Sequence, residues 1–138
     1  MTQEFKINRD TALSEFERFA ELMCIEIDKK NMKPDDSDSF DEMKEIVIRA
    51  IMRGDLIIND SGEPTYTPAR SDDKTPLTFY EPTGATLAAG DKRGSHQLTS
   101  RMYEILGSLT KTHASRFAKM KTNPDLKVCQ ALVVFFLA

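Results

Sequence analysis

Residues 53–67, RGDLIINDSGEPTYT, decide the fold class because a helical pattern of apolar residues stops here. Gly54 is suited to end the preceding helix in the left-handed conformation. Two short extended runs, Leu56–Ile58 and Thr65–Thr67, flank the turn-forming residues 59–62. The stretch therefore predicts a β-hairpin inside an otherwise helical chain.

A third strand is predicted shortly after the hairpin. Arg70–Thr75 is a polar loop, and Pro76 is followed by the apolar and β-favouring residues Leu77–Tyr80. Three strands with one apolar face are about the minimum that is stable when packed on helices. We therefore expect a small antiparallel β unit over residues 55–81.

Two helices are predicted before this unit, over residues 10–31 and 40–53. In the first, capped by Asp10 or Thr11, apolar residues recur at steps of three and four, and the helix should end near Asn31 because Pro34 disfavours helical geometry before it. We expect Asp35–Ser39 to be a linker and the second helix to begin at Ser39 or Asp41, because Ser39 and Glu42 match a capping box.

Further helices are predicted over residues 84–138. Thr83 caps a short helix that ends at Gly90, and two more cover Gln97–Leu109 and Thr112–Met120. Pro124 takes the first position of a last helix. The sequence thus predicts a single α+β domain over residues 1–138, mostly helical, with the three-stranded β unit between N-terminal and C-terminal helices.

Composition agrees with a globular protein. A chain of 138 residues that is 40% hydrophobic and 30% charged fits one domain and lies outside the disordered range. The N-terminus has no apolar signal region, and the longest apolar run, Ala131–Ala138, is too short to span a membrane. Cys24 and Cys129 lie in apolar helical patterns, so we expect reduced thiols in or near the core, as in a cytoplasmic protein.

No motif for catalysis, metal or cofactor binding is complete. His96 and His113 do not have the spacing of a metal-ligand pair. The acidic stretch 35–42 fails as an EF-hand loop, because Phe40 stands where an oxygen ligand is needed and Asp41 where glycine is needed. Residues 84–92 have five residues between the glycines rather than the four of a phosphate loop. We therefore expect no catalytic residues and no cofactor.

Two apolar surfaces are candidates for a partner interface. The first helix carries a broad stripe, and the last helix is apolar on every side, which indicates either a central place in the core or contact with another chain. The candidate interface residues, each of which fits the core equally well, are Leu13, Phe16, Met23, Phe135 and Phe136.

Charge is unevenly distributed around the net value of −3. Residues 1–69 have an acidic excess, and residues 70–138 have a basic excess. Because the basic residues are spaced out and few aromatic residues lie among them, solvated helix faces explain the pattern better than nucleic-acid binding. The two halves could instead pair between neighbouring subunits, and such head-to-tail contacts generate open assemblies. We therefore expect self-association.

Two runs resemble the tail assembly chaperones of tailed phages. They are residues 53–67 and Leu77-Thr78-Phe79-Tyr80-Glu81-Pro82-Thr83-Gly84-Ala85, in which a hairpin and a strand ending in a Glu-Pro-Thr turn lead into helices. Residues 109–137 also resemble the closing helices of this family. The resemblance covers about residues 40–138, and no residue in it is catalytic.

The resemblance implies a non-enzymatic protein of the infected host cytoplasm that is absent from the mature virion. Such a protein binds the tape measure protein, keeps it soluble and helps recruit tail tube protein, and it has no membrane partner. Two alternatives stay open: another phage or bacterial interaction or inhibitor module, and a small nucleic-acid-binding module that uses the basic C-terminal half.

Overall fold

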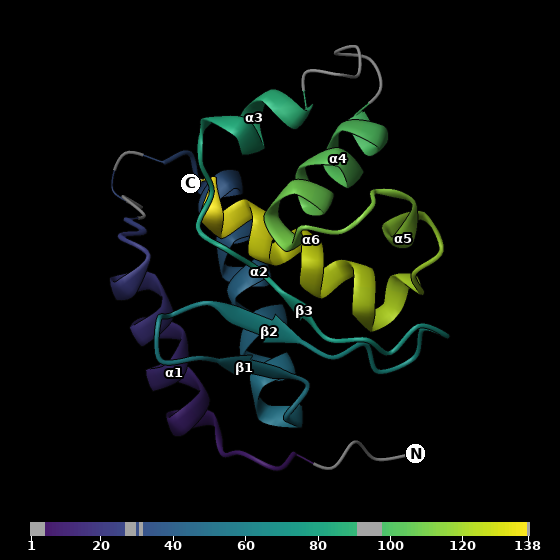
Figure 1. Ribbon diagram of the computed structural model, residues 1–138. Helices are drawn as coiled ribbons and strands as arrows, with labels where there is room; N and C mark the ends of the chain where they lie inside the picture. Colours follow the sequence, from purple (N-terminus) through teal and green to yellow (C-terminus); the bar gives the residue numbers. More distant parts are fainter. Residues whose placement is uncertain (1–4, 27–29, 31, 91–97, 138) are drawn as a thin grey trace.

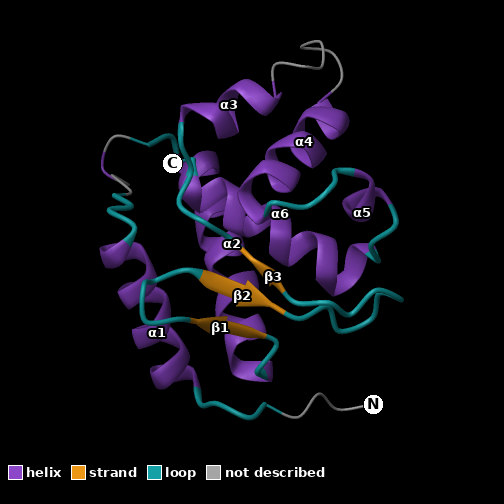
Figure 2. Ribbon diagram, in the orientation of Figure 1, coloured by secondary structure: helices purple, strands orange, loops and turns teal. Residues whose placement is uncertain are grey.

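The computed structural model describes residues 5–26, 30, 32–90 and 98–137. It shows a mostly helical α+β fold in which a small sheet lies between N-terminal and C-terminal helices (Figures 1 and 2). Its elements are α1 (Arg9–Leu22), α2 (Pro34–Arg53), β1 (Leu56–Ile58), β2 (Pro64–Tyr66), β3 (Leu77–Thr78), α3 (Gly84–Gly90), α4 (Leu98–Thr110), α5 (Ser115–Ala118), a π-helical turn (Thr122–Leu126) and α6 (Lys127–Phe136). The predicted fold class is confirmed.

The sheet has the order β1-β2-β3, and both pairs are antiparallel. Ile57 lies opposite Thr65, which in turn lies opposite Thr78. This row is on the outer face, where Ile57 is 62% exposed, and the neighbouring positions Leu56 and Tyr66 are fully buried. The alternation follows from the two-residue period of a strand. The predicted hairpin and third strand are confirmed.

The inner face of the sheet packs on helices α2 and α6, which lie behind it in Figure 1. The C-terminal half of α2 lies beside the start of α6, and Phe40 near the start of α2 meets Phe135 near the end of α6, so the two helices are antiparallel. Most residues of α6 are buried, including Val128, Leu132 and Phe135. The all-round apolar pattern of the last helix thus reflects its place in the core.

Helix α1 differs from the prediction at both ends. Asn8 caps it, with its side chain accepting a hydrogen bond from Thr11 N at 2.8 Å, so the cap is neither Asp10 nor Thr11. The helix ends at Leu22 rather than near Asn31, because Cys24 adopts a left-handed conformation with φ 55°. Cys24 is consequently exposed, so the prediction that it lies in or near the core was wrong.

Helix α2 begins earlier than predicted. Pro34 takes a first-turn position, where its missing N–H leaves no intrahelical bond unmade. The predicted linker, Asp35–Ser39, is therefore helical, and its two leading aspartates suit the positive end of the helix dipole. Ser39 does not cap the helix but donates its hydroxyl to Asp35 O at 3.1 Å. The predicted stop is confirmed, because Gly54 has φ 83°.

The C-terminal helices follow the predicted order with shorter bounds. The helix predicted over Thr112–Met120 is reduced to α5, and the start of the helix predicted at Gln97 falls on a residue outside those described. Pro124 lies in the π-helical turn that runs directly into α6 at Lys127, and the residue before it, Asn123, is the one with non-helical angles in that turn, so a helical run that begins at Pro124 agrees with the prediction. The predicted short helix after Thr83 is confirmed as α3.

Candidate functional site

Four of the five candidate interface residues lie in the core. Phe16, Met23, Phe135 and Phe136 are at most 9% exposed, and Leu13 is partly buried against the same core. These four side chains have little exposed surface, and the small exposed part of Phe136 lies in a groove described below. Their packing in the core agrees with one of the two environments that the sequence allowed, and their use as an interface stays a prediction.

Aromatic side chains of α1 and α6 pack against each other. The ring centroids of Phe16 and Phe135 are 5.0 Å apart, and those of Phe19 and Phe136 are 5.3 Å apart, both in edge-to-face geometry. Edge-to-face pairs contribute about 0.5–1.5 kcal/mol beyond the burial of their area. The stripe on the first helix is thus used to bind the last helix of the same chain.

Other large apolar side chains, outside the contact between α1 and α6, are exposed at the surface. The exposed large hydrophobic residues of the described chain are Phe5, Leu22, Ile57, Leu87 and Leu137. Leu87, on α3, and Leu137, just after α6, line one groove of about 350 Å³ together with Pro82, Thr83, Gly84 and Phe136. We call this the turn groove, because its lining includes Pro82 and Thr83 of the turn between β3 and α3. Sequence reasoning missed Leu87, since one leucine in a short alanine-rich helix does not reveal which side it faces.

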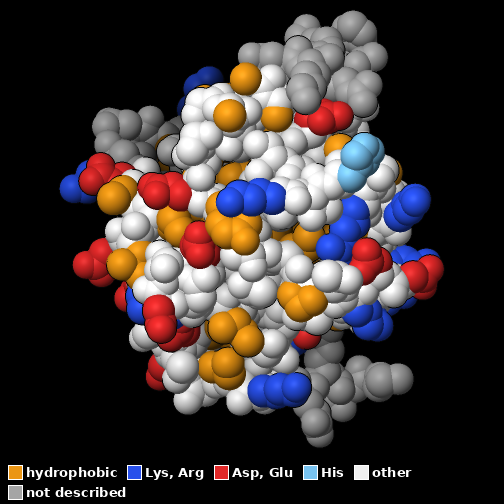
Figure 3. All heavy atoms as spheres, viewed as in Figure 1, with side chains coloured by type: hydrophobic (Ala, Val, Ile, Leu, Met, Phe, Trp, Pro, Cys, Tyr) orange, Lys and Arg blue, Asp and Glu red, His pale blue; other side chains and the backbone are white. Residues whose placement is uncertain are grey.

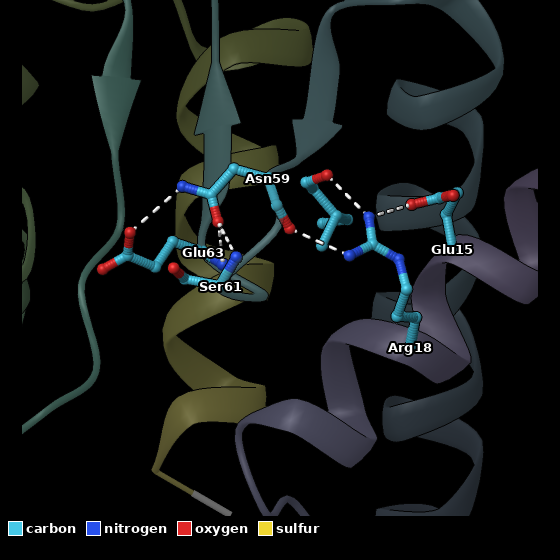
Figure 4. A network of polar contacts seen from close by, with 6 residues as sticks. Glu15, Arg18, Asn59, Ser61 and Glu63 are labelled. Carbon is cyan, nitrogen blue, oxygen red and sulfur yellow. Dashed lines mark hydrogen bonds and ion pairs between the residues drawn. The ribbon is translucent and has the colours of Figure 1, made fainter.

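A polar network ties α1 to the tip of the hairpin (Figure 4). Arg18 donates to Ile58 O at 2.7 Å and to Asn59 O at 2.9 Å, and it pairs with Glu15 at 2.6 Å. Asn59 Oδ1 accepts from the backbone N–H groups of Ser61 and Glu63, which closes the turn. Arg18 makes the contacts between the helix and the hairpin, and Asn59 makes those within the turn. The network therefore positions the hairpin on α1.

A second network is centred on Asp125, which is fully buried. Its Oδ1 accepts from Tyr66 Oη at 2.6 Å and from Ala69 N at 2.7 Å. Its Oδ2 accepts from Arg70 N at 3.0 Å, Ser71 N at 2.8 Å and Ser71 Oγ at 2.6 Å. A carboxylate between β2 and α6 thus fixes the loop that leads to β3.

The electrostatics of this network favour an ionised Asp125. Burial alone would raise the pKa of Asp125, but hydrogen bonds from Ser71, Tyr66 and two backbone amides outweigh it and lower that pKa to about 2. Burial and the nearby Asp125 carboxylate raise the pKa of Tyr66 far above its ordinary value. Although it combines Asp, Tyr and Ser, this cluster is buried, and Ser71 Oγ also accepts from Lys121 N. Its role is structural.

Sequence reasoning missed this centre. Asp125 looked like one more acidic residue in the first turn of a helix, and its only signal was its place among apolar neighbours. Cys129, as predicted, is a core thiol, and burial raises its pKa. His113 is exposed and pairs with Ser115 Oγ at 2.8 Å, while His96 lies outside the described residues.

Across the residues described, no group of three or more His, Cys, Asp or Glu side chains could hold a metal ion. Within the same part of the chain, every helix is too short or too polar to cross a membrane. A scan of known protein families, a search of curated proteins and a search of solved structures give no match. Function therefore has to be inferred from the residues and their geometry.

Proposed function

We propose that the protein is a non-enzymatic tail assembly chaperone of a tailed phage. It binds the tape measure protein in the host cytoplasm, keeps that protein soluble, helps recruit tail tube subunits and is left out of the mature virion. The resemblance of residues 53–67 and 77–85 to this family supports the proposal. In the structure these runs contain the β1–β2 hairpin and the strand β3 that leads through Glu81-Pro82-Thr83 into α3.

The observation that carries the proposal is the turn groove beside this family-like turn. Leu87 and Leu137 are 56% and 40% exposed and lie on the same groove. Exposed apolar side chains that gather in one place mark interaction sites, whereas single ones need no explanation. The groove lies at the end of the run that carries the resemblance.

An amphipathic helix is the partner that such a groove suits. Helices dock into apolar grooves through residues spaced three and four apart, and the tape measure protein is a long rod-like partner. Full burial of one leucine stabilises a complex by about 1.5–3 kcal/mol relative to its exposure. Two partly exposed leucines would thus supply a useful part of the binding free energy.

Co-purification with the tape measure protein encoded by the same genome tests the proposal. Leu87→Glu and Leu137→Glu should each reduce the amount of tape measure protein recovered in the soluble complex, because a buried unpaired carboxylate opposes docking. Ile57→Glu is the matched control, since Ile57 is also exposed but lies on β1, away from α3 in Figure 1. Equal recovery with all three variants would contradict the turn groove, and no recovery with the unchanged protein would contradict the chaperone role.

A further inference from the structure

A second groove lies between the C-terminal half of α2 and the start of α6. It has a volume of about 250 Å³. Its lining residues are Ile46, Arg49, Arg53, Asn123, Pro124, Lys127 and Val128. The lining combines an aliphatic floor with three cationic side chains and contains no acidic residue. We call it the basic groove.

This local charge is unusual for the chain, which has a net charge of −3 and a pI of about 5.4. On the face shown in Figure 3, acidic side chains gather over α1, and basic ones gather around α5. Arg70 is not in the lining, but its guanidinium lies beside the groove, because it donates to the carbonyl of Asn123 at 3.1 Å. The N-terminus of α6, which is the positive end of the helix dipole, also lies at this groove.

The cations of the basic groove are incompletely paired within the described chain. Lys127 is exposed, and its side chain has no hydrogen bond or ion pair there. Arg49 contacts Glu45 Oε1 at 3.2 Å, but Arg9 binds both oxygens of that carboxylate at 2.7 and 2.6 Å.

Arg53 is the third cation and is largely buried. Its Nε bonds to Asp55 at 3.1 Å, whereas its Nη2 is screened from water and has no hydrogen-bond partner. A buried donor left without an acceptor destabilises the folded protein. A carboxylate entering the basic groove would supply this acceptor after a small rotation of the guanidinium.

We propose that the basic groove binds an acidic peptide segment in which carboxylates flank an aliphatic side chain. The carboxylates pair with Arg49, Arg53 and Lys127, and the aliphatic side chain covers Ile46 and Pro124. Guanidinium groups bind carboxylates through paired hydrogen bonds, and partial desolvation by the floor strengthens these bonds.

Two other occupants fit less well. The lining of the basic groove has no aromatic ring on which a base could stack, so single-stranded nucleic acid would gain little beyond phosphate contacts. A second copy of the chain could offer the acidic start of α2, but Phe40 there packs on Phe135, with ring centroids 5.9 Å apart. The start of α2 therefore offers carboxylates but no free aliphatic side chain to pack in the basic groove.

Nitrogen-labelled full-length protein tests the proposal by NMR titration. The probe is a capped peptide of two leucines flanked on each side by glutamates. A second peptide has serines in place of the leucines, and an oligothymidine of equal charge is the third ligand. We expect the leucine peptide to shift the amide signals of Arg49, Arg53 and Lys127, and to bind more tightly than the other two ligands.

Substitutions of the lining residues test whether the peptide binds in the basic groove. Lys127→Glu should weaken peptide binding by about fivefold or more, since it converts one attraction into a repulsion. A glutamate is also favourable in the first turn of α6, so folding should be preserved. Arg49→Gln should weaken binding to a similar degree. Lys33→Glu makes the same charge change before the start of α2 and should leave binding unchanged.

Several results would overturn the proposal. They are no binding of the leucine peptide, equal binding of the serine peptide, tighter binding of the oligothymidine, or equal weakening by Lys33→Glu. Concentration-dependent shifts at Asp35 and Lys127 without peptide would instead assign the basic groove to self-association. The proposal is independent of the tail assembly role, because Leu87→Glu should impair capture of the tape measure protein without affecting this peptide.

Discussion

Replacing Asp125 by Asn keeps the shape of the side chain but removes its charge and one of its two acceptor oxygens. In the folded protein Oδ1 accepts two hydrogen bonds and Oδ2 accepts three, all from buried or part-buried donors. An amide nitrogen at either position would face N–H or O–H donors that have no other acceptor. Each such donor costs about 1–3 kcal/mol, so we expect Asp125→Asn to destabilise the protein by about 3 kcal/mol. For a domain of this size that lowers Tm by about 10 °C.

The same substitution should change how stability depends on pH. The folded-state pKa of Asp125 is about 2 and its ordinary value is 3.8, so the ionised form is favoured by folding. This contribution is present above about pH 4 and is lost as pH falls through about 2, and it amounts to about 2 kcal/mol. Glu45, whose hydrogen bond from Arg9 lowers its pKa to about 2, contributes in the same window. Because Glu45 is present in both proteins, the difference between them isolates Asp125.

Urea unfolding followed by circular dichroism at several pH values between 2 and 7 measures both quantities. The matched control is Asp72→Asn, an exposed residue in the same loop, which should change stability by less than about 0.5 kcal/mol. A free energy of unfolding for Asp125→Asn within about 1 kcal/mol of the unchanged protein at neutral pH would contradict a stabilising role for the carboxylate. So would a stability difference between the two proteins that does not shrink in acid.

Arg18→Ala should cost about 1–3 kcal/mol in urea unfolding, because two carbonyls at the end of β1 lose a charged donor; an unchanged midpoint would contradict this. Gly62→Ala should cost about 2 kcal/mol or more, since φ is 85° and the new Cβ would lie 2.6 Å from Leu22 Cβ. Adding Leu22→Ala should recover little of this loss, because the 2.6 Å contact is with Leu22 Cβ, which alanine keeps. Cys24 should react with a thiol reagent in the folded protein and Cys129 only after unfolding, as mass spectrometry of partly labelled protein can show.

The hairpin could be predicted because its signals are local. Asn59 closes the turn with its own side chain, and Gly62 and Gly54 occupy left-handed positions that other residues rarely adopt. The alternation of Leu56 and Ile57 between buried and exposed follows from strand geometry. These features depend on neighbouring residues in the chain, so the sequence contains what is needed to infer them.

The helix ends could not be predicted in the same way. The apolar spacing continues from Met23 to Ile25, but the chain leaves the helix at Leu22 and still packs both residues against the core. The Ser39 capping pattern competed with Pro34, which begins the helix more than a turn earlier. In each case a tertiary contact or a stronger start signal outweighed a plausible local pattern.

The candidate site shows a more general limit. Phe16, Phe135 and Phe136 looked equally suited to core and interface, because both environments select large apolar side chains. Only the packed structure shows that they bury one another and that Leu87 and Leu137 remain outside. Asp125 was missed for the related reason that its five donors come from residues more than fifty positions away.

We propose that this chain is a chaperone for a tape measure protein. The most direct test is the fraction of that protein found soluble when the two are co-expressed, compared with the tape measure protein expressed alone. We expect a marked rise in the soluble fraction with the unchanged chain and with Ile57→Glu, and a smaller rise with Leu87→Glu. A soluble fraction that does not depend on the chain would contradict it.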